Sequence, residues 1–456
     1  MTVKQGSLTE VVSAYAAATS FEQIPPEVRE QAKKVVFDEI LCAAFGNGQP
    51  AGRLAARYAL QFPALREALV IGTAIPVAAP FAALANGTAG HADEIDGAHS
   101  VGGHPGATIV HSALALAERQ QTSGAAFLNA VVLAYDIGTR LIKACGGTFG
   151  LKDEHHLHAD FLHAIGAAVA NARLLDLDPS AYRHSAALAT FQANGLCVLF
   201  QERSHLSKAF CNGQYAFAAI TAALLAQAGM EGADDVIGGD HGLLDAWGAP
   251  RGVGALIDGL GREYAIMHAN FKFMRAGYPI HAAVEAGLDL LRTNGIRWED
   301  LTSIHVGMPE NALQVVDNRQ MHNICIQDML SVALLHGQLD LNRSYFPEAL
   351  DDQRFWQLRK IVTVSVDVDL QNDEPNGRGA RVTLMTHSGR PVSRRVDAPR
   401  GHSSRGAVSW TDLSDKWRAA MPNVDVDTLI TLARHLEDLD DLRTITSLLA
   451  PTSFTT

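Results

Sequence analysis

The sequence predicts a mainly α fold, with a large all-α helical domain and an inserted, smaller α+β lid domain. Three observations predict this fold class. Alanine and leucine recur at helical spacing through residues 1–268, period-two strand patterns begin after about residue 269, and helical patterns return after residue 401. With 456 residues, the chain is long enough for two or three domains with a sizeable core. We therefore expect a helical domain of residues 1–268 and 401–456, and a lid domain of residues 269–400.

The helical part of the chain divides into segments that are separated by turn signals. The segments with helical length and spacing include residues 7–18, 26–45, 77–89, 124–143 and 164–175. Turn signals such as Gly46-Asn47-Gly48 and Gly146-Gly147 lie between them. Residues 164–175 are apolar nearly all round, which is typical of a helix inside a large bundle.

The later part of the chain changes from helical to strand patterns and back. Residues 303–308, 361–370 and 381–386 alternate apolar and polar side chains, so we expect strands there. A loop with two glycines follows at residues 399–406. Helical patterns then cover residues 410–421 and 426–449, which predicts a return to the helical domain.

The composition excludes several classes of protein. Apolar residues make up 47% of the chain and charged residues 19%, which excludes a disordered chain. The net charge of −12 argues against nucleic acid or an anionic membrane as a partner, although a local cluster of lysine and histidine can still bind a small anion. The five cysteines are widely spaced, and we find neither a secretory signal nor an uninterrupted apolar run of about 18 residues. We therefore expect a cytoplasmic protein without disulfides or a transmembrane helix.

The segment with the densest chemistry is residues 86–111, NGTAGHADEIDGAHSVGGHPGATIVH. It holds four histidines, three carboxylates and six glycines between two helical patterns. Pro105 is suited to the first position of a helix, which places His104 at the helix N-terminus, where an anion is favoured. A histidine beside a bound carboxylate can act as a general acid or base near neutral pH. The alternative is that these polar residues only cap helices, and the density of the cluster favours function.

A second cluster, residues 153–163 with the sequence DEHHLHADFLH, allows two interpretations. His155, His156 and His158 are possible metal ligands, but the HExxH spacing of zinc enzymes is absent. We therefore favour His158 facing the same cavity as His104, with His155 and His156 solvated, and we expect no metal.

Cationic residues mark two further segments. Lys208 stands near the start of an apolar helical pattern, either as a snorkelling surface residue or as the partner of a buried carboxylate. Lys272, Arg275 and Tyr278 surround a Gly-Tyr-Pro turn at the domain junction, where they form either a carboxylate site or an ordinary basic turn. We find no dinucleotide, Walker, GxSxG or pyridoxal phosphate motif, which predicts chemistry by side chains alone, without a cofactor.

Taken in this order, the four segments resemble the MmgE/PrpD family, which includes 2-methylcitrate dehydratase, cis-aconitate decarboxylase and iminodisuccinate epimerase. The matching residues are Asn86-Gly87, His91, Glu94, Asp96, His104-Pro105-Gly106, His158, Gly166-Ala167-Ala168, Leu174-Leu175, Lys208, Lys272, Tyr278-Pro279, residues 333–337, Pro399-Arg400-Gly401 and Asp415-Lys416-Trp417. The resemblance implies a homodimer with a lid over the helical domain, and a cofactor-free site between the domains.

The resemblance also implies site residues. His104 is similar to the family's loop histidine, Lys208 and Lys272 to its two site lysines, and His158 is a looser match. Glu94 takes the place of an aspartate. The family's DFDDT run reads Glu94-Ile95-Asp96-Gly97-Ala98 here, and His99 follows as a possible replacement for a lost proton carrier. Two more departures are Cys211, where histidine is common, and Asp328, where tyrosine is common.

The function expected from these residues is a lyase that removes a proton α to a carboxylate of a small di- or tricarboxylic acid and expels water. His104 or His158 is the expected base, and the other histidine or a protonated Glu94 assists the leaving group. Lys208, Lys272 and Arg275 stabilise the developing charge. Asp96, His99, Arg275 and Tyr278 are the expected substrate-binding residues.

Several alternatives stay open at this point. One is an epimerase or isomerase that uses the same proton abstraction, and another is a decarboxylase of a related polycarboxylate. Two further alternatives belong to other classes of protein. One is a non-catalytic binding protein on the same fold, and the other is a metal hydrolase built on His155, His156 and His158.

Overall fold

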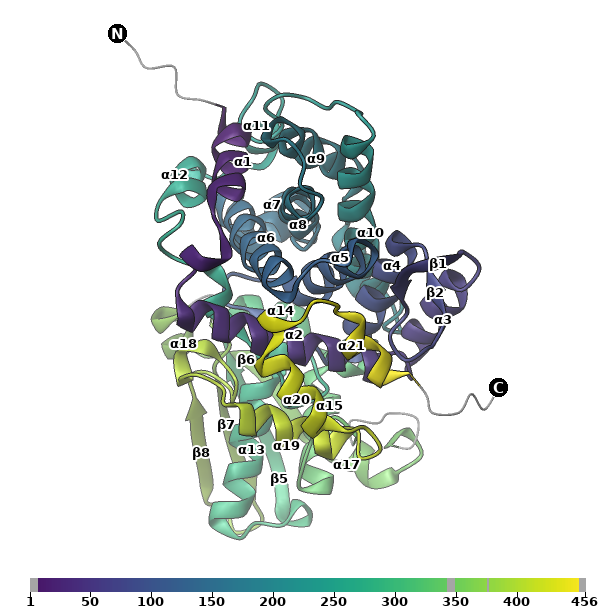
Figure 1. Ribbon diagram of the computed structural model, residues 1–456. Helices are drawn as coiled ribbons and strands as arrows, with labels where there is room; N and C mark the ends of the chain where they lie inside the picture. The colour runs from purple at the N-terminus through teal and green to yellow at the C-terminus, as the bar shows by residue number, and fades with distance from the viewer. Residues whose placement is uncertain (1–6, 343–348, 375–376, 451–456) are drawn as a thin grey trace.

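The computed structural model describes residues 7–342, 349–374 and 377–450. Helices dominate it, so the predicted mainly α fold is confirmed. Figure 1 shows a bundle of helices above a smaller part that contains a sheet, with α2 (Pro26–Gly46) crossing between them. The yellow C-terminal helices return to lie along α2.

The bundle is formed by residues 7–257 and the C-terminal helices. Its other helices are α1 (Leu8–Ala18), α3 (Pro50–Ala59), α4 (Ala79–Gly90), α5 (Pro105–Gln120), α6 (Gly124–Ala144), α7 (Gly147–His155), α8 (Phe161–Leu174), α9 (Pro179–Gln192), α10 (Ser207–Gln227), α11 (Leu243–Trp247), α12 (Gly252–Ile257), α19 (Trp410–Ala420), α20 (Val426–Arg434) and α21 (Arg443–Thr446). The apolar helix α8 lies end-on at the centre of a ring of helices in Figure 1, as its all-round apolar pattern predicts.

The contact between α4 and α10 matters most for the site, because it brings Lys208 to the end of α4. The two helices pack closely through Gly213, where a Cβ atom would overlap the carbonyl oxygen of Leu84. Any larger residue at position 213 would separate the helices and move Lys208 away from the loop that follows α4.

The smaller part is a four-stranded sheet covered by helices. Its elements are α13 (His281–Asn294), β5 (Leu301–Met308), α14 (Glu310–Val316), α15 (Ile326–His336), α17 (Gln353–Ile361), β6 (Val362–Val366), α18 (Val368–Asp373), β7 (Ala380–Thr386) and β8 (Pro391–Val396). The strand order is β6-β5-β7-β8, with β5 and β6 parallel and the other pairs antiparallel. On one face Ile304 and Val306 are buried, whereas His305 between them is exposed. The sheet therefore has one packed face and one solvated face.

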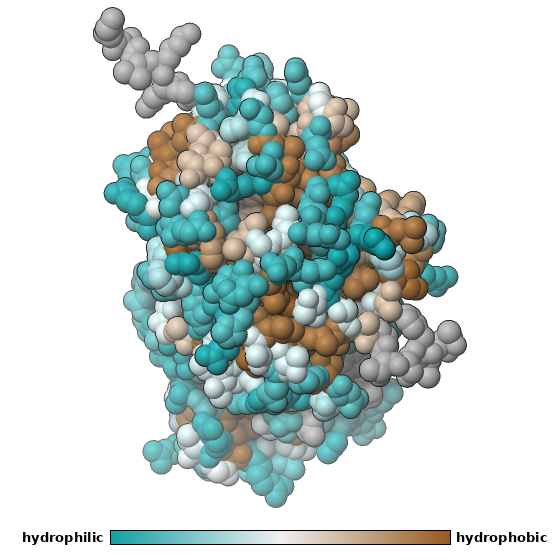
Figure 2. Space-filling view, viewed as in Figure 1, coloured by the Kyte–Doolittle hydropathy of each residue, from teal (hydrophilic) through white to brown (hydrophobic). Residues whose placement is uncertain are grey.

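Two hydrophobic cores follow the same division. One cluster joins the helical bundle to residues 408–449, and the second lies within residues 276–396. On the face shown in Figure 2, apolar residues gather near the centre, over α2 and α20, where Leu429 and Ala433 pack beside Phe37. The C-terminal helices thus belong energetically to the bundle, although they follow the sheet in sequence.

Two short ladders connect loops outside the main sheet. The strands β1 (Pro63–Leu69) and β2 (Pro76–Val77) form a hairpin that the sequence patterns did not predict. The strands β3 (Ala98–His99) and β4 (Ala269–Asn270) pair antiparallel. This second ladder fixes the loop after α4 to the junction that leads into the smaller domain.

Two sequence predictions are wrong in detail. The strand expected over residues 361–370 ends at Val366, because the Asp367 side chain accepts a hydrogen bond from the Leu370 N–H (3.0 Å) and starts α18. The single helix expected over residues 426–449 is broken after Arg434. The carbonyl of Leu439 in the break accepts a hydrogen bond from the N–H of Gly124 (2.7 Å) at the start of α6, so tertiary contact replaces helix continuation. The strand β8 was not predicted.

Two helices, α6 and α10, are long and apolar enough to cross a membrane by length and composition. In the structure, 89% of the apolar window of α6 and 61% of that of α10 is buried inside the protein. This burial is what core helices of a bundle show. The cytoplasmic location stays a prediction.

Candidate active site

The loop from residue 91 to residue 104 carries most of the site. It is shorter than the predicted segment 86–111, because α4 continues to Gly90 and α5 starts at Pro105. Asp93 and Glu94 both have positive φ angles, 56° and 61°, which non-glycine residues seldom adopt. Each such residue costs about 1–3 kcal/mol and persists only where the surroundings impose it. Here Arg275 imposes it, since the guanidinium is ion-paired with Asp93.

Two lysines from different parts of the chain converge on the carboxylate of Glu94. The ammonium of Lys208 contacts Oε1, and the ammonium of Lys272 lies 2.8 Å from Oε2. Lys272 also donates a hydrogen bond to the Glu94 carbonyl oxygen at 3.2 Å. All three residues are buried, and Lys208 is therefore the partner of a buried carboxylate rather than a snorkelling surface residue.

The two lysines keep Glu94 ionised. Burial alone would raise the pKa of the Glu94 carboxyl, but the charges of Lys208 and Lys272 outweigh burial and hold the pKa well below its usual range. The expectation that a protonated Glu94 assists a leaving group is therefore corrected. Glu94 instead holds the two ammonium groups in place, that of Lys208 at the active-site cavity and that of Lys272 buried behind it.

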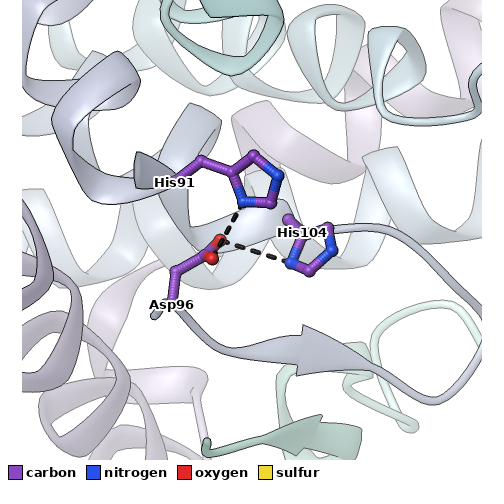
Figure 3. Close-up of side chains that lie close together, drawn as sticks. All are labelled: His91, Asp96 and His104. Carbon is purple, nitrogen blue, oxygen red and sulfur yellow. Dashed lines mark hydrogen bonds and ion pairs between the residues drawn. The ribbon is translucent and has the colours of Figure 1, made fainter. Parts of the chain in front are cut away.

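His91 and His104 lie next to one another and both contact the Asp96 carboxylate (Figure 3). The Nδ1 atom of His91 is 2.8 Å from one oxygen of Asp96, and the Nδ1 atom of His104 is 3.3 Å from the other. Burial lowers the pKa of His91 well below its usual range, so this ring is neutral. It donates Nδ1–H to Asp96 and accepts at Nε2 from the Lys208 ammonium, 2.7 Å away. Asp96 stays ionised, because the neighbouring histidines and Lys272 outweigh the effect of burial on its pKa.

The orientation of His104 leaves one ring nitrogen for chemistry. Its Nδ1 is 3.0 Å from the carbonyl oxygen of Gly97, which can only accept, so Nδ1 carries the proton in the neutral ring. The Nε2 atom points away from Asp96 (Figure 3) and lies 3.7 Å from the nearer oxygen of Glu94. His104 lines the cavity and is the N-cap of α5, as predicted. A neutral imidazole held in this way presents a lone pair to the cavity.

The anion at the N-terminus of α5 is supplied by the protein itself. The backbone N–H of His104 donates to Asp160 at 3.1 Å, and Gly103, with φ of 79°, leaves room for that carboxylate. Burial alone would raise the pKa of Asp160, but His158 and the other nearby histidines bring it down to about 2. His104 is thus held from both ends, through its backbone and through its ring.

The cavity beside these residues lies between the two parts of the molecule. It has a volume of about 780 Å³, counting its open mouth. Glu94, His104 and Lys208 line it from the bundle, and Tyr278 and Arg378 line it from the smaller domain.

His158 faces the same cavity as His104, as the sequence reasoning expected. Its Nδ1 is buried and has no hydrogen-bond partner within the described part of the chain, and its Nε2 lies 3.7 Å from Asp160. Burial lowers the pKa of His158, so the ring is neutral near pH 7. It is therefore a second ring that can exchange a proton with a bound molecule.

The other predicted binding residues have different surroundings. His99 lines the cavity, but its Nε2 is 2.8 Å from the Ala265 carbonyl and its Nδ1 accepts from the Val101 N–H, so both ring nitrogens are occupied. Burial lowers the pKa of His99 to about 3. Arg275 contacts Asp93 and Gln49 behind the loop. It therefore supports the loop, whereas Tyr278 reaches the cavity wall.

The metal-site alternative built on His155, His156 and His158 is not supported by the positions of these residues. His155 is the last residue of α7, His156 is exposed, and only His158 turns into the cavity. Two other groups within the described residues have ligand-like spacing. They are His91 with Asp96 and His104, and His91 with Glu94 and His205. The ammonium groups of Lys208 and Lys272 already contact the donor atoms of both groups, so the charge that a metal would bring is supplied by lysine.

Several site residues were missed by sequence reasoning. His91, His205 and Asp160 contribute to the buried network, and Arg378 lines the cavity from a loop before β7. His91 matched the family pattern and lies five residues before Asp96, which was the available signal for its role. Nothing local to Arg378 marks it, because its approach to the cavity depends on the packing of the domains.

The two remaining departures from the family pattern have ordinary partners. Burial raises the pKa of the Cys211 thiol, so it is no nucleophile at neutral pH. Asp328, on α15, is ion-paired with Arg359 (2.5 Å) and with His322 (2.7 Å).

Comparison with known families gives a match for both parts of the chain. Residues 10–254 match the MmgE/PrpD N-terminal domain, and residues 275–438 match the MmgE/PrpD C-terminal domain. The chain belongs to the MmgE/PrpD family. The members of this family are enzymes. Lys272 lies between the two matched ranges, in the junction that completes the site.

The chain is also similar over most of its length to distant MmgE/PrpD proteins. It is 25% identical to the cis-aconitate decarboxylase-like protein oryM of Aspergillus oryzae, over 98% of this chain and 97% of that protein. It is 24% identical to the cis-aconitate decarboxylase of Aspergillus terreus, over 87% and 86% of the two chains. The human cis-aconitate decarboxylase is 22% identical, over 97% and 94%.

Proposed function

We propose that this protein is a cofactor-free lyase that abstracts a proton α to a carboxylate of a small di- or tricarboxylic acid and eliminates water. The observation that carries the proposal is the fixed orientation of His104. Its Nδ1–H is held by Gly97 and Asp96, which leaves the second ring nitrogen for a molecule in the cavity that Lys208 also lines. A base next to a fixed cation is what abstraction of an α-proton requires.

In the proposed reaction, Nε2 of His104 takes the α-proton, and the electrons of the C–H bond become the new C=C bond. Negative charge moves toward the adjacent carboxylate in the transition state, and the ammonium of Lys208 stabilises it. The C–O bond on the β-carbon breaks, and the departing hydroxide leaves as water once it takes a proton. The proton that completes the water is the one that His104 has just taken, so His104 returns to its neutral form. The neutral ring of His158, which lines the same cavity and whose Nδ1 has no hydrogen-bond partner within the described residues, is proposed to assist the departing oxygen through a hydrogen bond.

Decarboxylation is a second candidate, favoured by the names of the relatives. A substrate such as cis-aconitate would lose CO₂ with charge developing beside Lys208, and a histidine would protonate the carbon. Epimerisation is a third outcome of the same proton abstraction. One panel separates the three: citrate, 2-methylcitrate and cis-aconitate are incubated in D₂O, with alkene absorbance, CO₂ release and α-deuterium measured together. Turnover of none of these polycarboxylates would count against the proposal.

The sharpest test of the base is His104→Asn. The asparagine amide can still donate to Gly97 from a position close to Nδ1, so the loop keeps its bond and only Nε2 is lost. We expect kcat to fall about 10²–10⁴-fold with an unchanged melting temperature. The matched control is the exposed residue His241, for which His241→Asn should keep full activity. Full activity of His104→Asn on the same substrate would contradict the assignment.

The proposal includes a homodimer, and one feature of the surface supports it. Five large apolar side chains between residues 191 and 210 are exposed, and they are Phe191, Leu196, Val198, Leu206 and Phe210. Such a concentration of exposed apolar side chains in one short stretch of the chain is what a protein interface would cover. We expect Val198→Lys to convert the dimer to a monomer, measured by light scattering after size exclusion. The exposed residue Leu65, on β1, supplies the control Leu65→Lys, which should stay dimeric.

A further inference from the structure

The wall of the cavity that the smaller domain supplies carries its own polar groups. Tyr278 is only 4% exposed, and its buried hydroxyl has no hydrogen-bond partner within the described residues. Arg378 lies in the loop between α18 and β7, and its guanidinium is 5.2 Å from the centre of the Phe149 ring. Both residues line the same cavity as His104 and Lys208. A buried hydroxyl without a partner costs free energy unless a ligand satisfies it.

The charges at the other wall are already balanced. At the cavity, Lys208 is ion-paired with the ionised Glu94, and behind them the buried Lys272 contacts Glu94 and the ionised Asp96. This balance leaves little net positive charge there for a ligand with several carboxylates. A substrate with more than one carboxylate therefore needs a second cationic group in the cavity.

The wall that carries Arg378 supplies this second cationic group. Lys152 and Arg378 both approach the ring of Phe149, at 5.9 and 5.2 Å from its centre. Lys152 is ion-paired with its neighbour Asp153, so its charge is largely compensated. Glu374 and Tyr278 both act on the charge of Arg378, and of these two only Tyr278 lines the cavity. Stacking on an aromatic ring holds a guanidinium while its N–H groups stay directed toward a partner.

We propose that Arg378 and Tyr278 bind a second carboxylate of the substrate, away from the bond that breaks. This inference rests on the proposed function and makes its substrate class narrower. The substrate carries one carboxylate at Lys208 and His104 and another at the Arg378 wall, with the reacting carbon between them. The planar fork of arginine accepts a carboxylate with two parallel hydrogen bonds, and the tyrosine hydroxyl donates a third. Arg378 is then a specificity-determining residue contributed by the smaller domain.

The test measures binding before it measures turnover. Propane-1,2,3-tricarboxylate is the probe, because it has several carboxylates and no leaving group, and butanoate is the matched monocarboxylate. Affinities are measured by calorimetry for the wild-type protein, Arg378→Gln and Tyr278→Phe. The control is Arg390→Gln, which makes the same change at an exposed position between β7 and β8. Far-UV circular dichroism and thermal unfolding verify the fold of each variant.

We expect Arg378→Gln to weaken binding of the tricarboxylate about 10–100-fold, the loss of a charge-assisted hydrogen-bonded pair. Tyr278→Phe should weaken it by a smaller factor, and Arg390→Gln should leave it unchanged. Butanoate affinity should be the same in all four proteins. If Arg378→Gln does not fold, Arg378→Lys replaces it, and its loss of the bidentate geometry should still weaken tricarboxylate binding.

Two results overturn the inference: equal tricarboxylate affinity of the wild type and the Arg378 variant, or no binding of the probe to the wild type at millimolar concentration. The failures of the two proposals are distinguishable. If the probe binds through Arg378 but no polycarboxylate is turned over, the lyase proposal fails and the binding wall stands. If the wild type turns over a polycarboxylate and Arg378→Gln retains its KM and kcat, the lyase stands and the Arg378 assignment fails.

Discussion

Three buried carboxylates, two at the seam between the bundle and the C-terminal helices and one in the active site, differ in the number of ammonium groups beside them. At the seam between the bundle and the C-terminal helices, Glu118 and Asp38 are 1% exposed, and in the active site Glu94 is 2% exposed. Glu118 accepts hydrogen bonds from the Thr446 hydroxyl (2.5 Å) and the Leu69 N–H (2.8 Å), without an ammonium partner. Asp38 has one ammonium partner, Lys416, at 2.7 Å. Glu94 has two.

The pKa of each carboxyl follows the number of ammonium groups beside it. Burial raises the pKa of Glu118 from its usual 4.5 to about 7. Burial also raises the pKa of Asp38, since one lysine does not outweigh it. Only at Glu94, with two lysines, does the pKa fall well below its usual range. Among these three carboxyls, only the one with two lysines is held ionised against burial. The seam therefore serves stability, whereas the site keeps fixed charges for chemistry.

Among the variants that test this comparison, we expect Glu94→Gln to have the largest effect. The substitution leaves two ammonium groups close together in a buried site with no carboxylate between them, so they repel and move apart. We expect kcat/KM to fall about 10²–10⁴-fold, because Lys208 loses its position at the cavity. Steady-state kinetics on the substrate found in the panel measures this loss.

The control for this variant is Glu118→Gln, which makes the same change at a buried carboxylate without lysines. It should retain full activity when both proteins are compared at equal folded concentration. If Glu94→Gln keeps more than half of the wild-type kcat/KM, the two lysines do not need Glu94 and the comparison of the two regions fails.

The second test breaks the one-lysine pair at the seam. In Lys416→Met, Asp38 keeps its hydrogen bond from the Trp417 indole N–H (2.7 Å) but loses its cation. We expect the free energy of unfolding to fall by about 3–5 kcal/mol, measured by urea denaturation, because a buried charge is left uncompensated. The turnover number of the remaining folded enzyme should not change.

Two further variants support the interpretation of that result. Lys360→Met, at an exposed position on α17, should lower the free energy of unfolding only slightly. The double variant Asp38→Asn with Lys416→Met should recover much of the lost stability, because it removes the uncompensated charge. A loss of kcat in Lys416→Met as large as in Glu94→Gln would show that the seam is part of the active site.

The fold was predictable where periodicity was long and uninterrupted. Residues 164–175 are apolar on all sides, and the structure places that helix at the centre of the bundle. Prediction failed where tertiary contact overrides local pattern. The alternating run at residues 361–370 stops being a strand at Asp367, because a side-chain cap starts a helix there. The break after Arg434 exists because the start of α6 packs against it, which no local pattern reveals.

The candidate site was predictable in its residues and less so in their roles. The density of polar residues around His104 and the family pattern were enough to select Glu94, Lys208 and Lys272. Their protonation was not predictable, because the ionised state of Glu94 depends on two lysines more than 100 residues away in sequence. The same is true of Arg275, which binds Asp93 across the domain junction rather than facing the cavity.

The third and smallest predicted effect is the pH dependence that Glu118 gives to the folding stability. Its pKa is about 7 in the folded protein and about 4.5 in the unfolded chain. Below pH 4.5 the carboxyl is protonated in both the folded and the unfolded state, so Glu118 does not lower the folding stability. Between pH 4.5 and 7 the unfolded state ionises while the folded state keeps its proton, so stability falls as pH rises. Above pH 7 the loss of stability is complete, and the raised pKa of Glu118 corresponds to a loss of roughly 3 kcal/mol in the free energy of unfolding.

Glu118→Gln removes this titration, since a glutamine amide can still accept from the Leu69 N–H and donate to the Thr446 hydroxyl. Urea unfolding of both proteins at pH 5, 6, 7 and 8 measures the difference in unfolding free energy, in which all other titrating groups cancel. We expect the difference to shift in favour of the variant by about 3 kcal/mol from pH 5 to pH 8, most of it before pH 7. A difference that stays constant across this range would mean that Glu118 keeps an ordinary pKa despite its burial. In that case burial without a cation would not raise the pKa of a carboxyl at the seam. Glu118 would then no longer support the relation between the pKa and the number of neighbouring ammonium groups.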